Sequence, residues 1–384
     1  MLALFALAHF MHHLLTALQV PLLPFIRDEF TLDYTQAGVV TAAFNIPYGI
    51  SQLPAGWLAD HIGPRLLIAI GICGVALAGF LVGFSQTYIL MIVFLGLMGV
   101  LGGGYHPASP PVISALVEPK NRGRALGVHL IGGSASFFLT PLIGVAIATA
   151  WGWRGSFITL AVPTMVFGIL FYVLMGRRAA TKRAEHRITN SHNEAPPTSG
   201  RLRRLAAFII LSTFAGAVTF SIIAFVPLLM VDHFSVSKET AAAFLALIYS
   251  AGLWASPLGG YLSDRLGRVP VVLAVCLITG PVLYLLSLAP YGLGIGALLL
   301  TIGMIQYIRM PVSEAYIIGQ TSEYNRSTIL GIYYFGNLEG TGLLTPVIGY
   351  LIDQFGFSTS FTIVAAITVT VTLACSILLW GKRD

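Results

Sequence analysis

Residues 56–65, Gly-Trp-Leu-Ala-Asp-His-Ile-Gly-Pro-Arg, have a second copy at residues 260–268, Gly-Tyr-Leu-Ser-Asp-Arg-Leu-Gly-Arg. The offset between the two aspartates is 264 − 60 = 204 residues. In each copy an apolar run ends at an aspartate, a glycine follows three residues later, and a basic residue precedes the next apolar run. Glycine permits a tight reversal, whereas aspartate and arginine are costly to place in hydrocarbon. The pattern predicts a short turn between two membrane helices at the water boundary, although a loop in a soluble helical bundle has a similar sequence.

The composition favours the membrane over the soluble bundle. Hydrophobic residues make up 56% and charged residues 9% of the 384 residues, and the mean hydropathy is +0.85. An average soluble domain has about 25% charged residues. A spanning helix needs about 20 mostly apolar residues, and twelve runs meet this need, so the predicted fold class is an all-α membrane protein. The predicted spans are 2–26, 36–58, 65–84, 88–116, 124–148, 156–176, 205–231, 239–262, 269–289, 292–319, 328–351 and 359–380.

The net charge of +6 comes from basic residues on one side of the predicted membrane. Of the 21 lysines and arginines, Arg309 lies inside a span, and only Arg27, Arg154 and Lys238 fall in loops on the side opposite the two turns. Basic residues concentrate in cytoplasmic loops, so the turns and both termini are predicted to be cytoplasmic. This asymmetry explains the basic composition without a nucleic-acid partner.

The internal repeat extends through each half of the chain. For example, Val-Pro-Leu-Leu at residues 20–23 returns at residues 226–229. An even number of spans in each half gives both copies the same orientation, so we predict two parallel six-helix repeats. The predicted parts are an N-terminal half (1–176), a basic and polar cytoplasmic linker (177–204) and a C-terminal half (205–384).

Two six-span halves, a basic linker and the repeated turn resemble the major facilitator superfamily of secondary transporters. The resemblance covers the whole chain, although His61 and Pro64 replace basic residues that are usual in the family's signature loop. It implies a major facilitator fold of twelve transmembrane helices, location in a bacterial inner membrane, and transport by alternating access. In this family each signature loop contacts the start of a helix in the other half and stabilises the outward-open state. The gating residues that the resemblance implies are Asp60, Arg65, Asp264 and Arg268.

Within the superfamily, Gly-Gly-Tyr-His-Pro at residues 103–107 is similar to the fosmidomycin resistance branch, whose members export an anionic phosphonate antibiotic. That branch usually has an acidic residue at the position of His13 and another where this chain has Ala108. The resemblance implies proton-coupled export of a small organic anion or antibiotic, as an antiporter. The alternative is proton-coupled uptake of a small organic anion such as a carboxylate.

Three charged residues fall inside predicted spans: Arg309, Glu314 and Glu339. A charge at the bilayer centre costs about 2.5 to 3.5 kcal/mol on insertion scales, so each is a functional candidate. Arg309 and Glu314 lie about 140° apart around a helix, so we expect Glu339 to be the partner of Arg309. Arg309 and Glu339 then form a structural ion pair, or Arg309 binds an anionic substrate for which a glutamate competes.

Histidines form the other polar feature of the spans. His9 and His13 lie one helical turn apart, and the resemblance places His106 opposite Arg309 in a central cavity. Such histidines could couple transport to protons, add positive charge for an anion, or only form neutral hydrogen bonds. We predict no metal, because neither cysteines nor a matched carboxylate accompany them. The predicted substrate-binding residues are His9, His13, Asn45, Gln52, Tyr105, His106, Tyr249, Gln306 and Arg309. The predicted proton-coupling residues are Glu314, Glu339 and His106.

Other function classes fit the sequence less well. It contains no nucleotide-binding loop, nucleophile triad or haem motif, so we predict neither an enzyme nor a cofactor. A receptor or scaffold on a transporter fold would be expected to add a soluble domain, whereas only residues 381–384 follow the last predicted span. A lipid carrier on the same fold stays an alternative. The expected partners are an anionic small molecule, protons and membrane lipid, with the protein as a monomer.

Overall fold

The structure, a computed structural model, describes residues 1–118, 121–179, 199–321 and 326–379. Within these ranges it does not describe the side chains of Asp60, 177–179, 199–201 and 326–327. The described residues form helices joined by short turns and contain no strand, which confirms the predicted all-α class.

The helices follow the predicted spans, but three spans are each divided into two consecutive helices. The fifth and sixth predicted spans are continuous in one helix, and so are the eleventh and twelfth. The first part of the chain forms α1 (Leu2–Thr16), α2 (Gln19–Phe30), α3 (Tyr34–Ile62), α4 (Pro64–Gly83), α5 (Tyr88–Gly102), α6 (Tyr105–Ala115) and α7 (Arg122–Ala179). The second part forms α8 (Ser199–Leu228), a π-helix (Leu229–His233), α9 (Lys238–Leu266), α10 (Arg268–Leu288), α11 (Leu293–Gln320) and α12 (Arg326–Leu379).

Glycines in the left-handed region make the sharp turns. Gly63 (φ +87°) joins α3 to α4, and Gly267 (φ +90°) joins α9 to α10, as the repeated motif predicts. Gly152 (φ +75°) bends α7, and Gly356 (φ +73°) bends α12 at the equivalent place. Residues with a side chain rarely adopt these angles, so glycine at the four positions is a requirement of the fold.

Nine stretches of the described residues are long and apolar enough to cross a membrane. Two of them, in α7 and α12, are 53 and 52 residues long, which is more than twice the about 20 residues of one crossing. The 29-residue α3 contains a predicted span but is not among the nine. The chain is thus a membrane protein with many apolar helices, and the number twelve stays a prediction.

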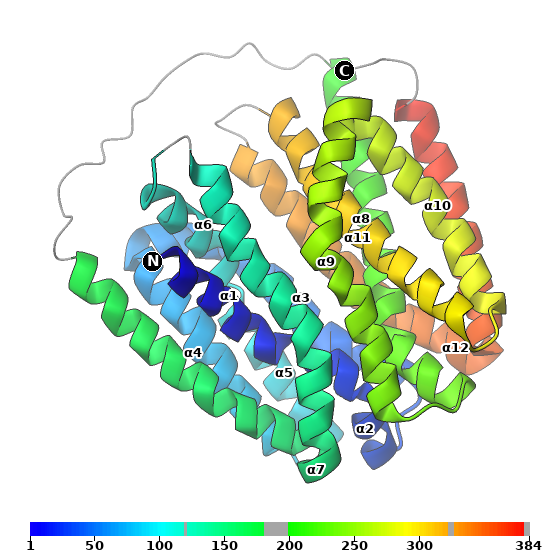
Figure 1. Cartoon of the computed structure of the whole chain (residues 1–384), viewed down its shortest axis with the longest axis horizontal. Coiled ribbons are helices and arrows are strands. Elements are labelled where there is room, and N and C mark those ends of the chain that lie inside the picture. Colours follow the sequence, from blue (N-terminus) through cyan, green and yellow to red (C-terminus); the bar gives the residue numbers. More distant parts are fainter. Residues whose placement is uncertain (119–120, 180–198, 322–325, 380–384) are drawn as a thin grey trace.

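Helices α1–α7 and α8–α12 form two groups that meet along α3 with α12 and along α7 with α9 (Figure 1). In the figure the groups converge at the lower end of the bundle, where α2 lies. Small residues allow the close approach: a Cβ atom on Gly38 would collide with the backbone of Thr345 and Pro346, and one on Gly349 with that of Tyr34.

Polar contacts join the two groups at this end, which we call the paired end. The carboxylate of Asp353, on α12, accepts hydrogen bonds from the backbone N–H groups of Tyr34 and Thr35, both at 2.8 Å, and from the Thr35 hydroxyl at 2.6 Å. These donors form the first turn of α3, where the helix dipole favours a negative charge. A carboxylate of one group therefore caps a helix of the other.

Further side-chain contacts join the two groups at the paired end. The Thr149 hydroxyl, on α7, donates to Glu239 in the first turn of α9 at 2.6 Å, and Lys238 pairs with Asp28 at 2.5 Å.

An ion pair on α2 and a half-buried phenol complete the paired end. Arg27 forms an ion pair with Asp232 of the π-helix. Tyr34 donates to the same carboxylate at 2.9 Å, and its partial burial, together with this bond, raises the pKa of Tyr34 to about 12. The phenol therefore stays a hydrogen-bond donor throughout the neutral pH range.

Candidate functional site

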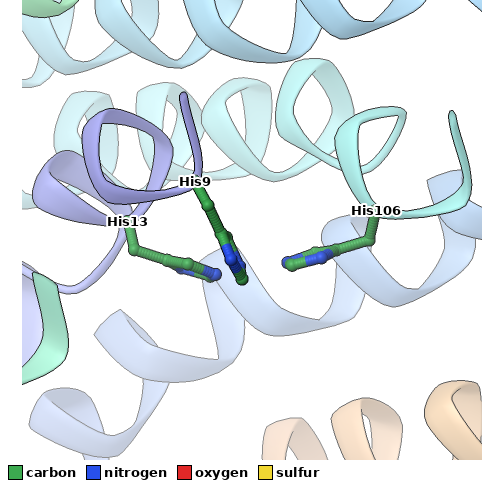
Figure 2. A group of neighbouring side chains, drawn as sticks. All are labelled: His9, His13 and His106. Atoms are coloured by element: carbon green, nitrogen blue, oxygen red, sulfur yellow. The ribbon is translucent and has the colours of Figure 1, made fainter. Parts of the chain in front are cut away.

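A cluster of histidines occupies the N-terminal group of helices. His9 and His13 project from α1 and His106 from α6, and Figure 2 shows the three rings turned toward one another. Their ring centres lie 4.8 Å apart for His9 and His13, and 5.2 Å apart for His106 with either of them. His129 of α7 stacks on His9 with ring centres 4.2 Å apart. The fold thus gathers histidines from three helices, of which the sequence predicted His9, His13 and His106.

Hydrogen bonds to backbone carbonyls fix the rings of His9 and His12, as well as that of His129. His9 Nδ1 lies 3.0 Å from the carbonyl oxygen of His129, and His12 Nδ1 lies 3.1 Å from that of Gly71. A carbonyl only accepts, so both Nδ1 atoms carry the proton. His12 Nε2 then accepts from the Tyr48 hydroxyl at 3.1 Å. Both nitrogens of His12 are therefore satisfied, and this histidine supports the cluster.

Glycine and tyrosine shape the wall of the cluster. A Cβ atom on Gly133 would lie 2.6 to 2.9 Å from the His9 ring, so only glycine leaves room for it. Tyr105 is fully buried and stacks on His12 with ring centres 4.6 Å apart. Its hydroxyl is buried without a hydrogen-bond partner among the described residues, which is a costly arrangement unless a water or ligand reaches it.

In the C-terminal group the outstanding residue is Arg309 of α11, which is 1% exposed. Its Nη1 donates to the carbonyl oxygen of Ser212 at 2.6 Å, to the Ser212 hydroxyl at 2.8 Å and to the Tyr333 hydroxyl at 3.1 Å. Its Nη2 donates to Gln306 Oε1 at 3.0 Å, and its Nε is buried without a partner. All the described acceptors of this guanidinium are neutral.

The expected ion pair between Arg309 and Glu339 is absent from the described residues. Glu339 of α12 instead turns toward α3, where a Cβ atom on Gly49 would collide with its Oε1, and this oxygen is buried without a hydrogen-bond partner. The expectation failed because the rotation of α12 directs this side chain to the interface between the groups. Glu314 interacts with Tyr334 of α12, and it forms no ion pair with Arg309 among the described residues.

The other predicted binding residues lie near the interface between the two groups. Asn45 and Gln52 are partly buried on α3. Tyr249 of α9 is buried, and its ring centre lies 5.3 Å from that of Phe137 on α7. Phe137 in turn lies 4.7 Å from the ring centre of His13. A run of aromatic rings therefore connects the histidine cluster to the C-terminal group.

His106 and Arg309, expected to face one another, each have their described contacts within their own group. The rings around His106 belong to His9, His12, His13, Tyr48 and Tyr105. The structure adds residues that the sequence reasoning missed, namely His129, Ser212 and Tyr333. A histidine within an apolar run was a usable signal for His129, whereas nothing in the sequence distinguishes Ser212 or Tyr333 from other polar residues in the spans.

The predicted gating residues have no described contact between the groups. Arg65 donates to the Tyr172 carbonyl at 2.9 and 2.7 Å and stacks on its ring, within the N-terminal group. Arg268 lies beside Gly319, within the C-terminal group. Asp264 is exposed and has no described partner, and the side chain of Asp60 lies outside the described residues. The expected contact of Asp264 with the start of α7 is therefore not formed while the paired end is closed.

Comparison with known proteins identifies relatives along the whole chain. The family model described as Major Facilitator Superfamily matches residues 5–305 and 208–384. The chain is 26% identical to the probable sulfoacetate transporter SauU of Cupriavidus necator, with 87% of this chain and 82% of the relative covered. It is 23% identical to the hexuronate transporter of Bacillus subtilis, with 91% and 87% covered. It is 26% identical to the multidrug resistance protein MdtG of Proteus mirabilis, with 91% and 89% covered.

Proposed function

The chain belongs to the Major Facilitator Superfamily, and we propose that it moves a small organic anion across the membrane by alternating access, coupled to protons. The family and the relatives are transporters and not enzymes. Two of the relatives are named for sulfoacetate and for hexuronate, which are small organic anions. Their names support an anionic substrate that carries a carboxylate.

The observation that carries the proposal is the buried guanidinium of Arg309, held only by neutral acceptors. Glu314 interacts electrostatically with Arg309 but makes no hydrogen bond to it among the described residues. A buried charge without an opposite charge in contact is destabilising by several kcal/mol. An anionic substrate would supply the missing charge, and the planar guanidinium suits a carboxylate or sulfonate. Because Arg309 is 1% exposed, the anion reaches it only after Gln306 or a neighbouring helix moves. Such movement is expected of a site that alternates between two sides.

For proton coupling we propose the two glutamates of the spans. Glu339 Oε1 is buried without a partner at the contact between α3 and α12. An ionised carboxylate at this place is destabilising, and a bound proton relieves the cost. Glu314, beside Tyr334, is the second candidate. A glutamate between the two groups is well placed to link proton binding to their relative movement.

Direction is a separate part of the proposal. With the predicted topology, the closed paired end faces outward, so this conformation is ready to exchange substrate with the cytoplasm. The sequence favours export, and the similarity to MdtG, a multidrug resistance protein, supports it. Uptake of a carboxylate is the second candidate, and the names of the anion transporters support the substrate without fixing the direction.

The experiment is transport in proteoliposomes under an imposed pH gradient, with sulfoacetate, a hexuronate and a phosphonate as substrates. Loss of one partner of a desolvated charge pair costs about 2 to 5 kcal/mol, so Arg309→Gln should lower transport at low substrate concentration by about 30-fold or more. Arg309→Lys should keep part of the activity, because lysine keeps the positive charge. It should not keep all of it, because lysine lacks the paired N–H donors of the planar guanidinium.

The matched control is Arg203→Gln, which changes an exposed arginine of the same group outside the signature loop. It should transport as wild type does. The sign of the pH-gradient dependence separates export from uptake. Undiminished anion transport by Arg309→Gln would remove Arg309 from the binding site, and transport of neutral compounds alone would overturn the anion proposal.

A further inference from the structure

His9, His13 and His106, which we call the histidine triad, have an arrangement that anion binding does not explain. One nitrogen from each ring lies within 4.8 Å of one nitrogen from each of the other two. The rings come from two helices and converge on one point (Figure 2). Imidazole rings in the neutral state offer an organic anion no charge, whereas they are common ligands of a metal ion.

The hydrogen bonds around the triad determine which nitrogens are free. Nδ1 of His9 donates to the carbonyl of His129, so in the neutral imidazole Nε2 of His9 holds the lone pair. Nδ1 of His13 lies 3.1 Å from the Thr16 hydroxyl oxygen. Thr16 gives its own proton to the carbonyl of His12 at 3.3 Å, so it accepts from His13. Nε2 of His13 therefore also holds a lone pair.

Such bonds are the usual support of a metal-binding histidine. A ligating imidazole normally donates its second N–H to a carbonyl, a carboxylate or another acceptor, which fixes the ring and its tautomer. His9 and His13 both show this support before any ion is considered. No described hydrogen bond engages His106, so neither of its ring nitrogens is committed to another partner among the described residues.

The spacing fits a tetrahedral ion. Three imidazole nitrogens about 2.1 Å from a zinc ion at tetrahedral angles place their ring centres about 5 Å apart. The ring centres of the triad are separated by 4.8, 5.2 and 5.2 Å.

We propose that the histidine triad binds one divalent transition-metal ion of the zinc type, through Nε2 of His9, Nε2 of His13 and a ring nitrogen of His106. Imidazole ligands favour Zn²⁺, Cu²⁺ or Ni²⁺, and disfavour Mg²⁺ and Ca²⁺, which prefer oxygen. Three protein ligands leave a fourth position open to a water molecule or an anion. The sequence predicted no metal, because it did not show that α6 and the acceptors on His129 and Thr16 complete the site.

The test is zinc binding by the purified full-length protein in detergent after treatment with a chelator. Calorimetric titration should give one Zn²⁺ per chain and no binding of Mg²⁺. Co²⁺ in place of Zn²⁺ should give the intense visible absorption of a tetrahedral site. His106→Ala should remove the site. Thr16→Val, which removes only the acceptor of His13, should weaken binding about 10- to 100-fold.

His61→Ala is the control, because this histidine is exposed and distant in sequence from the triad. It should bind as wild type does. Thermal melting of each variant establishes that it is folded, and His106→Gln serves if the alanine variant is not. Equal zinc binding by wild type and a folded His106 variant, or an octahedral Co²⁺ spectrum, would overturn the proposal. This assay needs no transport, so its outcome is independent of the anion proposal.

Discussion

Asp353→Ala should open the paired end. In the structure this carboxylate accepts three hydrogen bonds from the first turn of α3, two of them from backbone N–H groups. A carboxylate at an exposed helix N-terminus is worth about 0.3 to 1 kcal/mol, and removal of a capping side chain costs about 1 kcal/mol. Because Asp353 is exposed, we expect its removal to destabilise the closed paired end by about 1 to 2 kcal/mol in total. This changes the ratio of the closed to the open population about 5- to 30-fold.

The loss falls on one conformation only, because the two groups make this contact when the paired end is closed. The equilibrium should therefore move toward the conformation with an open paired end. Double electron–electron resonance can measure this shift as a change in the distance distribution between spin labels at Gln86 and Tyr291. These two exposed residues lie at the paired end, one in each group. The labels require a background in which serine replaces the three native cysteines.

Asp353→Asn should give about half of the shift, because the amide keeps one acceptor oxygen and loses the charge. Gln354→Ala, a change at the exposed neighbouring position, should give none. An unchanged distance distribution in Asp353→Ala would refute the reasoning, because the cap would then contribute nothing to closure.

Three further changes test the packing around the charged residues. Gly49→Ala places a methyl group against Glu339 and should lower the melting temperature through about 1 to 3 kcal/mol of overpacking, whereas Gly260→Ala, with no atom within 4 Å, should be neutral. Glu339→Gln should abolish the dependence of transport on the pH gradient without unfolding the protein; full retention of that dependence would exclude Glu339 as the proton carrier. Ser212→Ala removes one acceptor of Arg309 and should cost about 1 to 3 kcal/mol in chemical unfolding, and an unchanged unfolding midpoint would show that water replaces it.

The sequence was sufficient for the fold because its signals are local and repeated. Gly63 and Gly267 form the turns of the duplicated motif, and Gly152 and Gly356 bend their helices at equivalent positions. Each of these glycines is required by its own backbone angle, so its role does not depend on distant contacts. The long apolar helices likewise follow from composition alone.

The site was less predictable because its contacts depend on helix rotation and on backbone acceptors. The sequence identified Arg309 as a buried charge, but its carbonyl acceptor belongs to Ser212, and any residue has a carbonyl. From their opposite charges, the sequence predicted an ion pair between Arg309 and Glu339. The rotation of α12 instead places Glu339 against Gly49. The hydrogen bond from His9 to the carbonyl of His129 also could not be predicted, because it depends on a backbone group that every residue has.

The ion pairs of the paired end make the protein sensitive to ionic strength on one side of the membrane. Arg27 with Asp232 and Lys238 with Asp28 are the described ion pairs between the two groups, and both are partly open to solvent. Exposed charges are screened over about 8 Å at physiological salt and over about 3 Å at 1 M. Salt added to the compartment that bathes the paired end should therefore favour its opening, while the same salt on the other side leaves these pairs intact. A vesicle with unequal salt across its membrane would favour one conformation before any substrate or proton is bound.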